Sequence, residues 1–133
     1  MKKCNVYLKE RYFDIIDAKT KAGVRSVPIA AKLLPFFKSW IKRGSEYFLS
    51  LPDGKHFTYH HFLKSHWKRL VDKLGLDHLP HDTRHTTVSL LAKANVNQTI
   101  IKKIVGHSRA QSLTERVYTH FDIQQLVDAI DLI

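Results

Sequence analysis

The sequence after Pro80 has the periodicity of several helices separated by helix-ending residues, and this feature most limits what the chain can fold into. Apolar residues recur there at the spacing that places them on one face of a helix. Three amphipathic helices are predicted in this way, over residues 81–94, 98–105 and 123–133. Asn97 is a favourable N-cap for the second helix, and Gly106 is a favourable stop. The C-terminal half is therefore expected to be a helical bundle.

Two further expectations concern the same half of the chain. A helix with polar neighbours around Tyr118 is predicted over about 110–119. In the helix over 81–94, four apolar side chains are expected to face the core, namely Val88, Leu90, Leu91 and Ala94.

The N-terminal residues instead predict a β-hairpin. The alternating segment "RYFDIIDA" (11–18) is typical of a strand, and "RSVPI" (25–29) is typical of a returning strand. Pro28 would stand at the end of that strand, where its missing N–H does least harm. The turn "KTKAGV" contains Gly23, and the tip of the hairpin is expected to carry three cations, Lys19, Lys21 and Arg25.

Three elements are expected between the hairpin and Pro80. A helix over 30–44 would tolerate Pro35 in its first turn and end at Gly44. The segment "YFLSL" (47–51) predicts a short strand, and a helix capped by Thr58 should run to about Leu74 before Gly75. We therefore expect a single α+β domain, mainly α-helical, in which an N-terminal β-hairpin or small sheet packs on a helical bundle.

Composition narrows the class of protein. With 133 residues, of which 44% are hydrophobic and 26% charged, the chain has the size of one domain with one core. Its apolar runs are short and interrupted by lysines, which argues against a membrane span, and its start lacks a signal-peptide core. Cys4 is the single cysteine, which excludes an internal disulfide and a cysteine-rich zinc site. A cytoplasmic setting is expected.

The net charge indicates the class of partner. Lys and Arg number 22 against 12 acidic residues, which gives a formal charge of +10. A positive field of this size favours polyanions, and nucleic acids are the commonest of them. Charge alone is also compatible with a basic protein that binds no nucleic acid.

The segment "HDTRH" (81–85) permits two interpretations. His81 and His85 are four residues apart on one helical face, close to the H-E-x-x-H pattern of zinc proteases. However, Asp82 replaces the longer glutamate base, Arg84 would place a cation beside the metal, and no third ligand follows at helical spacing. A metal-dependent hydrolase is therefore the remote alternative, and neither a metal nor a cofactor is expected.

A phosphate site uses the same residues better. His81 and Arg84 share a helical face, and a guanidinium offers a two-pronged hydrogen-bond donor for phosphate oxygens. His107 follows Gly106 at a helix end, where an imidazole can project toward an anion. Tyr118 lies beyond, and a phenol near cations is favoured as a nucleophile. Each residue alone is more often structural, but their ordered combination is informative.

That combination resembles the tyrosine recombinase family, also called phage integrases. The matching motifs are "HDTRHT", "IVGHS" and "VYTH", together with the hairpin "KTKAGVRSVPI", and they extend over nearly the whole chain. The resemblance implies a mainly helical catalytic domain with a small sheet. It also implies cutting and rejoining of double-stranded DNA without a cofactor.

The resemblance assigns a role to each motif residue. Tyr118 would attack a DNA phosphate and form a 3′-phosphotyrosine link, and Arg84 and His107 would bind the non-bridging oxygens of that phosphate. His81 would help to manage the proton of the nucleophile. A hairpin lysine would protonate the departing 5′-oxygen.

Spacing to Pro28 favours Lys19 over Lys21 as that lysine. His85 and His120 also match common family residues, with supporting roles. The wider DNA-contacting set is expected to comprise Lys19, Lys21, Arg25, Arg84, His85, Lys102, Lys103 and Arg109. The resemblance further implies a bacterial or phage-encoded protein that assembles as a tetramer on DNA when full-length, whereas a fragment could be monomeric.

One departure from the family pattern concerns the first catalytic arginine. The family carries it upstream of the hairpin in a helix, and neither Arg11 nor Arg25 is predicted to lie in such a helix. Residues 1–133 are therefore expected to be a C-terminal catalytic fragment without that helix and without the DNA-clamping domain. Such a fragment should be poorly active or inactive. A non-catalytic DNA-binding module of the same fold is the alternative.

Overall fold

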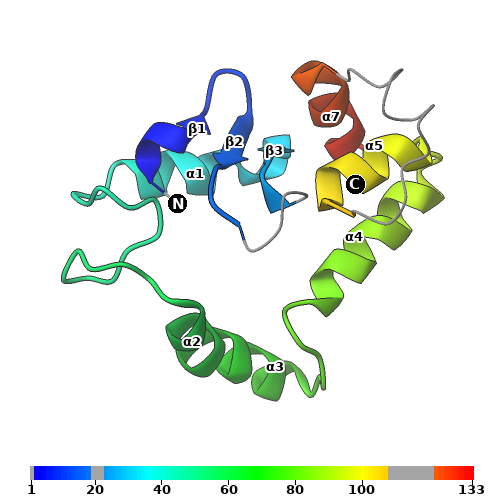
Figure 1. Cartoon of the computed structure of the whole chain (residues 1–133). Helices are drawn as coiled ribbons and strands as arrows, with labels where there is room; N and C mark the ends of the chain where they lie inside the picture. Colours follow the sequence, from blue (N-terminus) through cyan, green and yellow to red (C-terminus); the bar gives the residue numbers. More distant parts are fainter. Residues whose placement is uncertain (1, 19–22, 108–121) are drawn as a thin grey trace.

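The computed structural model describes residues 2–18, 23–107 and 122–133, in which a small antiparallel sheet lies beside a set of helices (Figure 1). The sheet has three strands in the order β1-β2-β3. Their bounds are Val6–Tyr7 for β1, Tyr12–Ile15 for β2 and Arg25–Pro28 for β3. The predicted α+β class with a small sheet is confirmed.

The predicted hairpin is formed by β2 and β3. The two strands are antiparallel, with Phe13 opposite Val27 and Ile15 opposite Arg25. Pro28 ends β3, as predicted, while β2 is shorter than the predicted 11–18 because pairing stops at Ile15. The tip residues 19–22 lie outside the described residues.

Two features of the sheet were not predicted. The short strand β1 pairs with β2, and two residues are too few to show an alternating pattern. Arg11 does not lie in a strand but in the turn before β2, with a positive φ of 61°. Its side chain holds that turn, because its Nε and Nη2 both donate to the carbonyl oxygen of Ile29, at 3.3 and 3.0 Å.

The described helices follow the predicted order, and the helix predicted over about 110–119 lies outside the described residues. Two short 3-10 turns precede longer elements, at Lys3–Asn5 and Ala31–Leu33. The α-helices among the described residues are α1 (Leu34–Ile41), α2 (Tyr59–Phe62), α3 (Lys68–Leu74), α4 (Asp82–Lys93), α5 (Gln98–Val105) and α7 (Ile123–Ile130). A π-helical turn at Leu63–Trp67 connects α2 to α3.

The predicted helix ends are confirmed at several places. Thr58 caps α2 by accepting a hydrogen bond from His61 N at 3.2 Å, and Asn97 caps α5 by accepting one from Thr99 N at 2.8 Å. Gly75 and Gly106 end α3 and α5 in the left-handed conformation, which costs glycine little. The stops predicted at Gly75 and Gly106 are therefore confirmed, whereas the stop predicted at Gly44 is wrong, because α1 already ends at Ile41.

The strand predicted over 47–51 is wrong. This segment makes only isolated bridges, between Lys2 and Tyr47 and between Ser50 and His56. Its apolar character has another cause, since Phe48 is 2% exposed and packs against Phe37 and Trp40. Burial of a loop residue, rather than strand pairing, explains the pattern.

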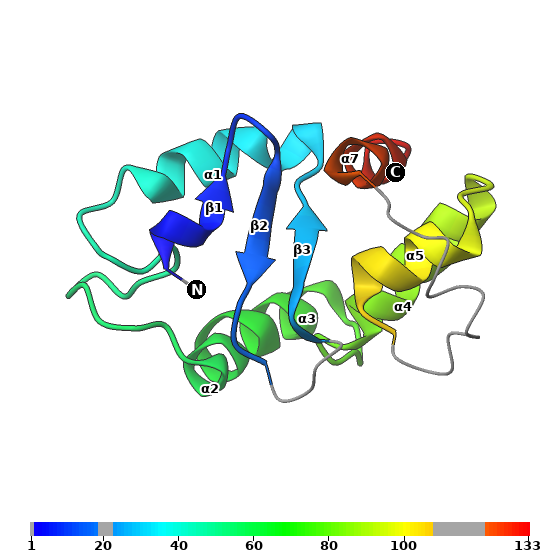
Figure 2. The same cartoon turned by 45° about the horizontal axis from the view of Figure 1, so that its top comes forward.

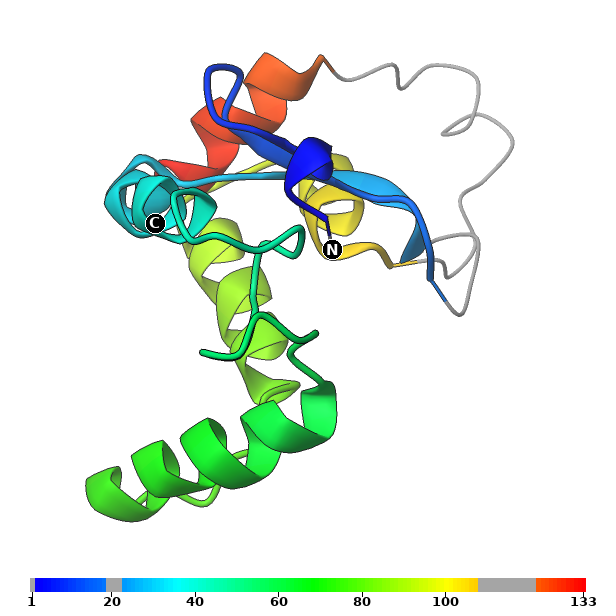
Figure 3. The same ribbon diagram turned by 90° about the vertical axis from the view of Figure 1, so that its left-hand side faces the viewer.

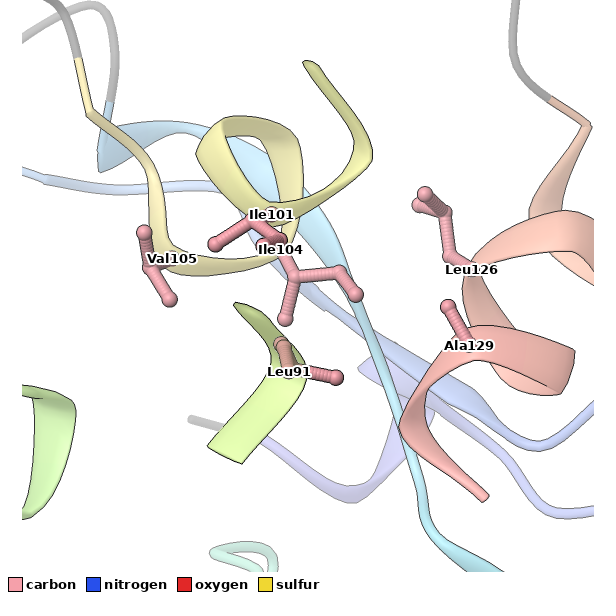
Figure 4. Packing of buried hydrophobic residues seen from close by; sticks show 6 residues of the cluster. All are labelled: Leu91, Ile101, Ile104, Val105, Leu126 and Ala129. Atoms are coloured by element: carbon pink, nitrogen blue, oxygen red, sulfur yellow. The ribbon is translucent and has the colours of Figure 1, made fainter. Parts of the chain in front are cut away.

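The buried residues form two clusters. The first, here called the helical core, joins α4, α5 and α7 (Figure 4) and consists of Leu91, Ile101, Ile104, Val105, Leu126 and Ala129. The second, the sheet core, lies between the sheet and α1 and consists of Ile29, Phe37 and Phe48. Of the apolar face predicted for α4, Leu91 is fully buried, but Leu90 is 45% exposed and that assignment is wrong.

The arrangement of layers places the end of α5 beside the hairpin. Strand β3 contacts both α5 and α7, and α4 packs on α5 (Figure 2). Helices α2 and α3 form an arm that lies apart from the sheet and is joined to the rest of the chain by the segments that follow α1 and precede α4 (Figure 3). In the part of the chain that the structure describes, no helix is long and apolar enough to cross a membrane.

Candidate functional site

Arg84 lies in the first turn of α4, where local hydrogen bonds fix the start of the helix. Asp82 accepts a hydrogen bond from Leu79 N at 2.8 Å, and Thr83 Oγ1 donates to the Pro80 carbonyl oxygen at 2.7 Å. Arg84 is half-buried, and its Nε is shielded from solvent without a hydrogen-bond partner among the described residues. A shielded guanidinium N–H of this kind is costly unless another group completes the site.

Arg25 reaches the end of α5 from the first position of β3. Its Nε donates to the carbonyl oxygen of Ile104 at 3.1 Å, and its Nη1 donates to that of Gly23 at 3.1 Å. The prediction that Arg25 stands at the hairpin tip is therefore wrong. Its guanidinium joins the turn to the end of α5, because Gly23 and Ile104 each supply one of the two carbonyl acceptors.

Gly106 provides the space for this contact. A Cβ atom built on Gly106 would lie 2.9 Å from Cζ of Arg25, closer than Cβ atoms come to other heavy atoms in proteins. Gly106 also has a φ of 72°, which favours glycine by itself. The sequence indicated the need for a positive φ, because Gly106 was predicted as a helix stop. It gave no signal for the close contact with Arg25.

Arg25 and Arg84 are close enough to influence each other electrostatically. Burial, and after it the positive charge of Arg84, lower the pKa of the Arg25 guanidinium from its ordinary value. Within residues 2–18, 23–107 and 122–133, the ion pairs involve neither arginine. The two like charges are thus uncompensated there, which is the electrostatic setting of an anion site.

His107 directly follows Gly106 at the same end of α5. Its backbone N–H donates to the carbonyl oxygen of Lys102 at 3.0 Å, and its side chain is exposed. The imidazole lines a hollow of about 200 Å³ between α4 and α5, whose rim also includes Lys102 and Gln98. The helix end therefore holds the backbone of His107 next to the glycine on which Arg25 rests.

His81 and His85 lie side by side at the start of α4. Their ring centroids are 5.2 Å apart and the rings are nearly perpendicular, at 82°. Asp82, between them in sequence, accepts a hydrogen bond from Leu79 N and lies 3.5 Å from His78 Nδ1, so its carboxylate already has structural partners. No group of three metal-binding side chains occurs in the described ranges.

The remaining predicted residues divide into two groups. Lys102 and Lys103 lie in the last turn of α5, Lys103 exposed and Lys102 half-buried. The others lie outside the described residues, namely Lys19, Lys21, Arg109, Tyr118 and His120. The predicted convergence of these residues with Arg84 and His107, and of Arg84 with His107, therefore stays a prediction.

Comparison with known proteins gives two relatives. Over 130 residues the chain is 28% identical to a protein named "Tyrosine recombinase XerC-like" from Caldanaerobacter subterraneus subsp. tengcongensis, covering 85% of this chain and 33% of that protein. Over 59 residues it is 37% identical to "Tyrosine recombinase XerA" from Saccharolobus solfataricus, covering 44% of this chain and 20% of that protein. No solved structure matches.

The family assignment rests on a longer match. The chain spans a third or less of the length of these two relatives. The sequence model of the phage integrase family, in contrast, matches residues 1–125. With a match over almost its whole length, this chain belongs to the phage integrase family.

Proposed function

We propose that this chain is the C-terminal part of the catalytic domain of a site-specific DNA recombinase, which cuts and rejoins double-stranded DNA through a phosphotyrosine intermediate. The observation that carries the proposal is a pair of guanidinium groups that influence each other and form no ion pair with a described carboxylate, Arg25 against the end of α5 and Arg84 in the first turn of α4. Membership of the phage integrase family supports the same conclusion.

In the proposed reaction, the Tyr118 oxygen bonds to a DNA phosphorus while the bond from phosphorus to the 5′-oxygen breaks. His81 receives the tyrosine proton, and Lys19 gives a proton to the departing 5′-oxygen. Arg84 and His107 donate hydrogen bonds to the non-bridging oxygens, where charge develops. One such donor is worth about 10²–10³ in rate in enzymes of other classes. Reversal of the step rejoins the strand, so no external energy source is needed.

The isolated 133 residues should bind duplex DNA but cleave it slowly. Neither Arg11 nor Arg25 lies in a helix before the hairpin, where the family pattern has its first arginine, so the proposed set lacks this preorganised cation. A looser hold on DNA would also align the phosphate with Tyr118 less often. Assembly into a tetramer on DNA, with the fragment monomeric in solution, belongs to the same proposal.

Trapping of a covalent adduct tests the proposal. The substrate is a duplex nicked close to the cleavage site, so that cleavage releases a short strand carrying the 5′-hydroxyl. Without this strand the DNA cannot be rejoined, and the complete gene product should accumulate a protein–DNA adduct. Tyr118→Phe should abolish the adduct and preserve binding, because only the nucleophilic oxygen is removed. Tyr59→Phe is the matched control, since Tyr59 is 66% exposed on α2 and has no role in the proposed site.

The outcome also separates the two main alternatives. An adduct that persists in Tyr118→Phe would mean that another nucleophile acts. Salt-dependent DNA binding without any adduct in the unsubstituted protein would instead favour the non-catalytic DNA-binding module.

A further inference from the structure

The side chain of Arg25 joins two segments that are distant in sequence and that both lead to proposed catalytic residues. Gly23, whose carbonyl oxygen accepts from Nη1, directly follows the residues 19–22 that include Lys19. Ile104, whose carbonyl oxygen accepts from Nε, lies three residues before His107. No described side chain other than that of Arg25 hydrogen-bonds both segments.

We propose that Arg25 is a positioning residue that sets the hairpin lysine relative to the proposed phosphate-binding residues Arg84 and His107. This inference rests on the proposed function. It assigns Arg25 to the alignment of the general acid and not to the binding of DNA along the hairpin tip.

The geometry explains why an arginine is required. The planar guanidinium directs Nε–H and Nη1–H to two different carbonyl groups at 3.1 Å each, with their relative directions fixed. A lysine at position 25 would keep the charge, but its single ammonium group lacks this fixed fork. Arg25→Lys should therefore preserve the electrostatics approximately while loosening the connection between hairpin and α5.

Gly106 is the second residue on which the contact between Arg25 and α5 depends, because it has no Cβ. A Cβ atom on residue 106 would lie only 2.9 Å from Cζ of this guanidinium. Any side chain at position 106 must therefore displace Arg25 or the end of α5, and the backbone of His107 begins at that point. Gly106→Ala should produce the same change as Arg25→Lys by a different route.

The contact between Arg25 and the end of α5 forms against the electrostatic repulsion of a second arginine. Arg25 and Arg84 repel each other, and no described carboxylate pairs with either of them. The two carbonyl oxygens hold the Arg25 guanidinium in place against this repulsion. A phosphate bound at Arg84 would reduce the repulsion, so the connection should be firmest when DNA is present.

Amide hydrogen exchange on the 133-residue chain tests whether the connection exists. The amides of Gly106 and His107 both donate to Lys102 O, so their exchange reports on the end of α5. In Arg25→Lys and in Gly106→Ala, exchange at His107 should become about tenfold faster, whereas the amides of α7 keep their rates. Lys38→Ala, an exposed change on α1, is the control. Unchanged exchange at His107 in Arg25→Lys would overturn the inference, whether or not the chain proves to be a recombinase.

Cleavage of a modified DNA tests whether the connection acts through the lysine. With an ordinary nicked duplex, Arg25→Lys in the complete gene product should form adduct about 10²-fold more slowly, the usual value of a general acid. With sulfur in place of the bridging 5′-oxygen, the leaving group needs no proton, so the rate should return to within about threefold of the unsubstituted protein on the same DNA. Lys19→Ala should show the same recovery.

The results distinguish the inference from the proposed function. If the unsubstituted protein forms adduct and sulfur fails to restore Arg25→Lys, Arg25 acts through the fold or the DNA grip and the inference is wrong. If the unsubstituted protein forms no adduct with either DNA, the proposed function is wrong, and with it the role of Arg25 in catalysis.

Discussion

Arg11 and Asp131 form an ion pair that joins the turn before β2 to the residue after α7, although the two are 120 positions apart in sequence. Asp131 also accepts a hydrogen bond from Ala31 N at 2.8 Å. These contacts connect the end of α7 to the turn before β2 and to the 3-10 turn that precedes α1. Its side chains Leu126 and Val127 are 2% and 1% exposed.

Replacement of Asp131 by Asn should lower the stability in a pH-dependent way. The hydrogen bond from Arg11 is the main cause that lowers the pKa of Asp131. A lowered pKa adds stability that is present above the unfolded pKa, about 3.9, and is lost as pH falls through the folded value. Asp131→Asn should therefore cost about 1 kcal/mol at pH 7, since the pair is partly exposed.

Urea unfolding at two pH values checks this expectation. The difference between Asp131→Asn and the unsubstituted chain should be present at neutral pH and should disappear well below the folded pKa. Asp72→Asn, an exposed change on α3, is the control. A difference of equal size at both pH values would show that the charge of Asp131 is not what stabilises the fold.

Alanine variants of two glycines separate the stability lost through contact with Arg25 from the stability lost through backbone strain. Gly106 and Gly75 have φ values of 72° and 65°, but only at Gly106 would a Cβ meet another side chain within 4 Å. Alanine at Gly75 should cost about 1–2 kcal/mol, the strain of a left-handed residue. Alanine at Gly106 should cost at least about 1 kcal/mol more, because Arg25 must also move.

Denaturant midpoints of the two variants measure that difference, provided that the dependence of free energy on denaturant stays the same. Equal losses in Gly106→Ala and Gly75→Ala would mean that the guanidinium moves away from Gly106 without cost.

The sequence predicted those features of the structure that depend on residues close together in the chain, and failed for those that depend on distant residues. Local signals worked well, such as the caps at Thr58 and Asn97 and the stop at Gly106, because hydrogen bonds within a few residues decide them. The wrong strand at 47–51 and the wrong core position of Leu90 both depend on packing against distant residues. Apolar pattern alone does not distinguish these outcomes.

The candidate site shows the same division. Sequence motifs predict Arg84 and His107 as site residues, since their spacing within the chain carries the pattern, and this assignment stays a prediction. The contact of Arg25 with Ile104 spans 79 positions and leaves no periodic signal, so Arg25 was placed at the hairpin tip. Long-range side-chain contacts of this kind follow from the packing of β3 on α5.

DNA binding by the chain should depend strongly on salt. If it neutralises about five phosphates, log K should fall with log salt at a slope of about −4 to −5. Added chelator should change neither binding nor folding. Titration of a labelled duplex at several salt concentrations measures the slope, and an affinity unchanged from low to physiological salt would mean that the charge of +10 is incidental.

The identity of the residue bonded to DNA is the most direct test of the proposed chemistry. A nicked duplex is incubated with the complete gene product, the adduct is digested with protease and nuclease, and the modified peptide is sequenced by mass spectrometry. The expected product is the peptide that contains Tyr118, carrying a nucleotide joined through its 3′-phosphate. A nucleotide found on any other residue, or joined through a 5′-phosphate, would contradict the proposed mechanism.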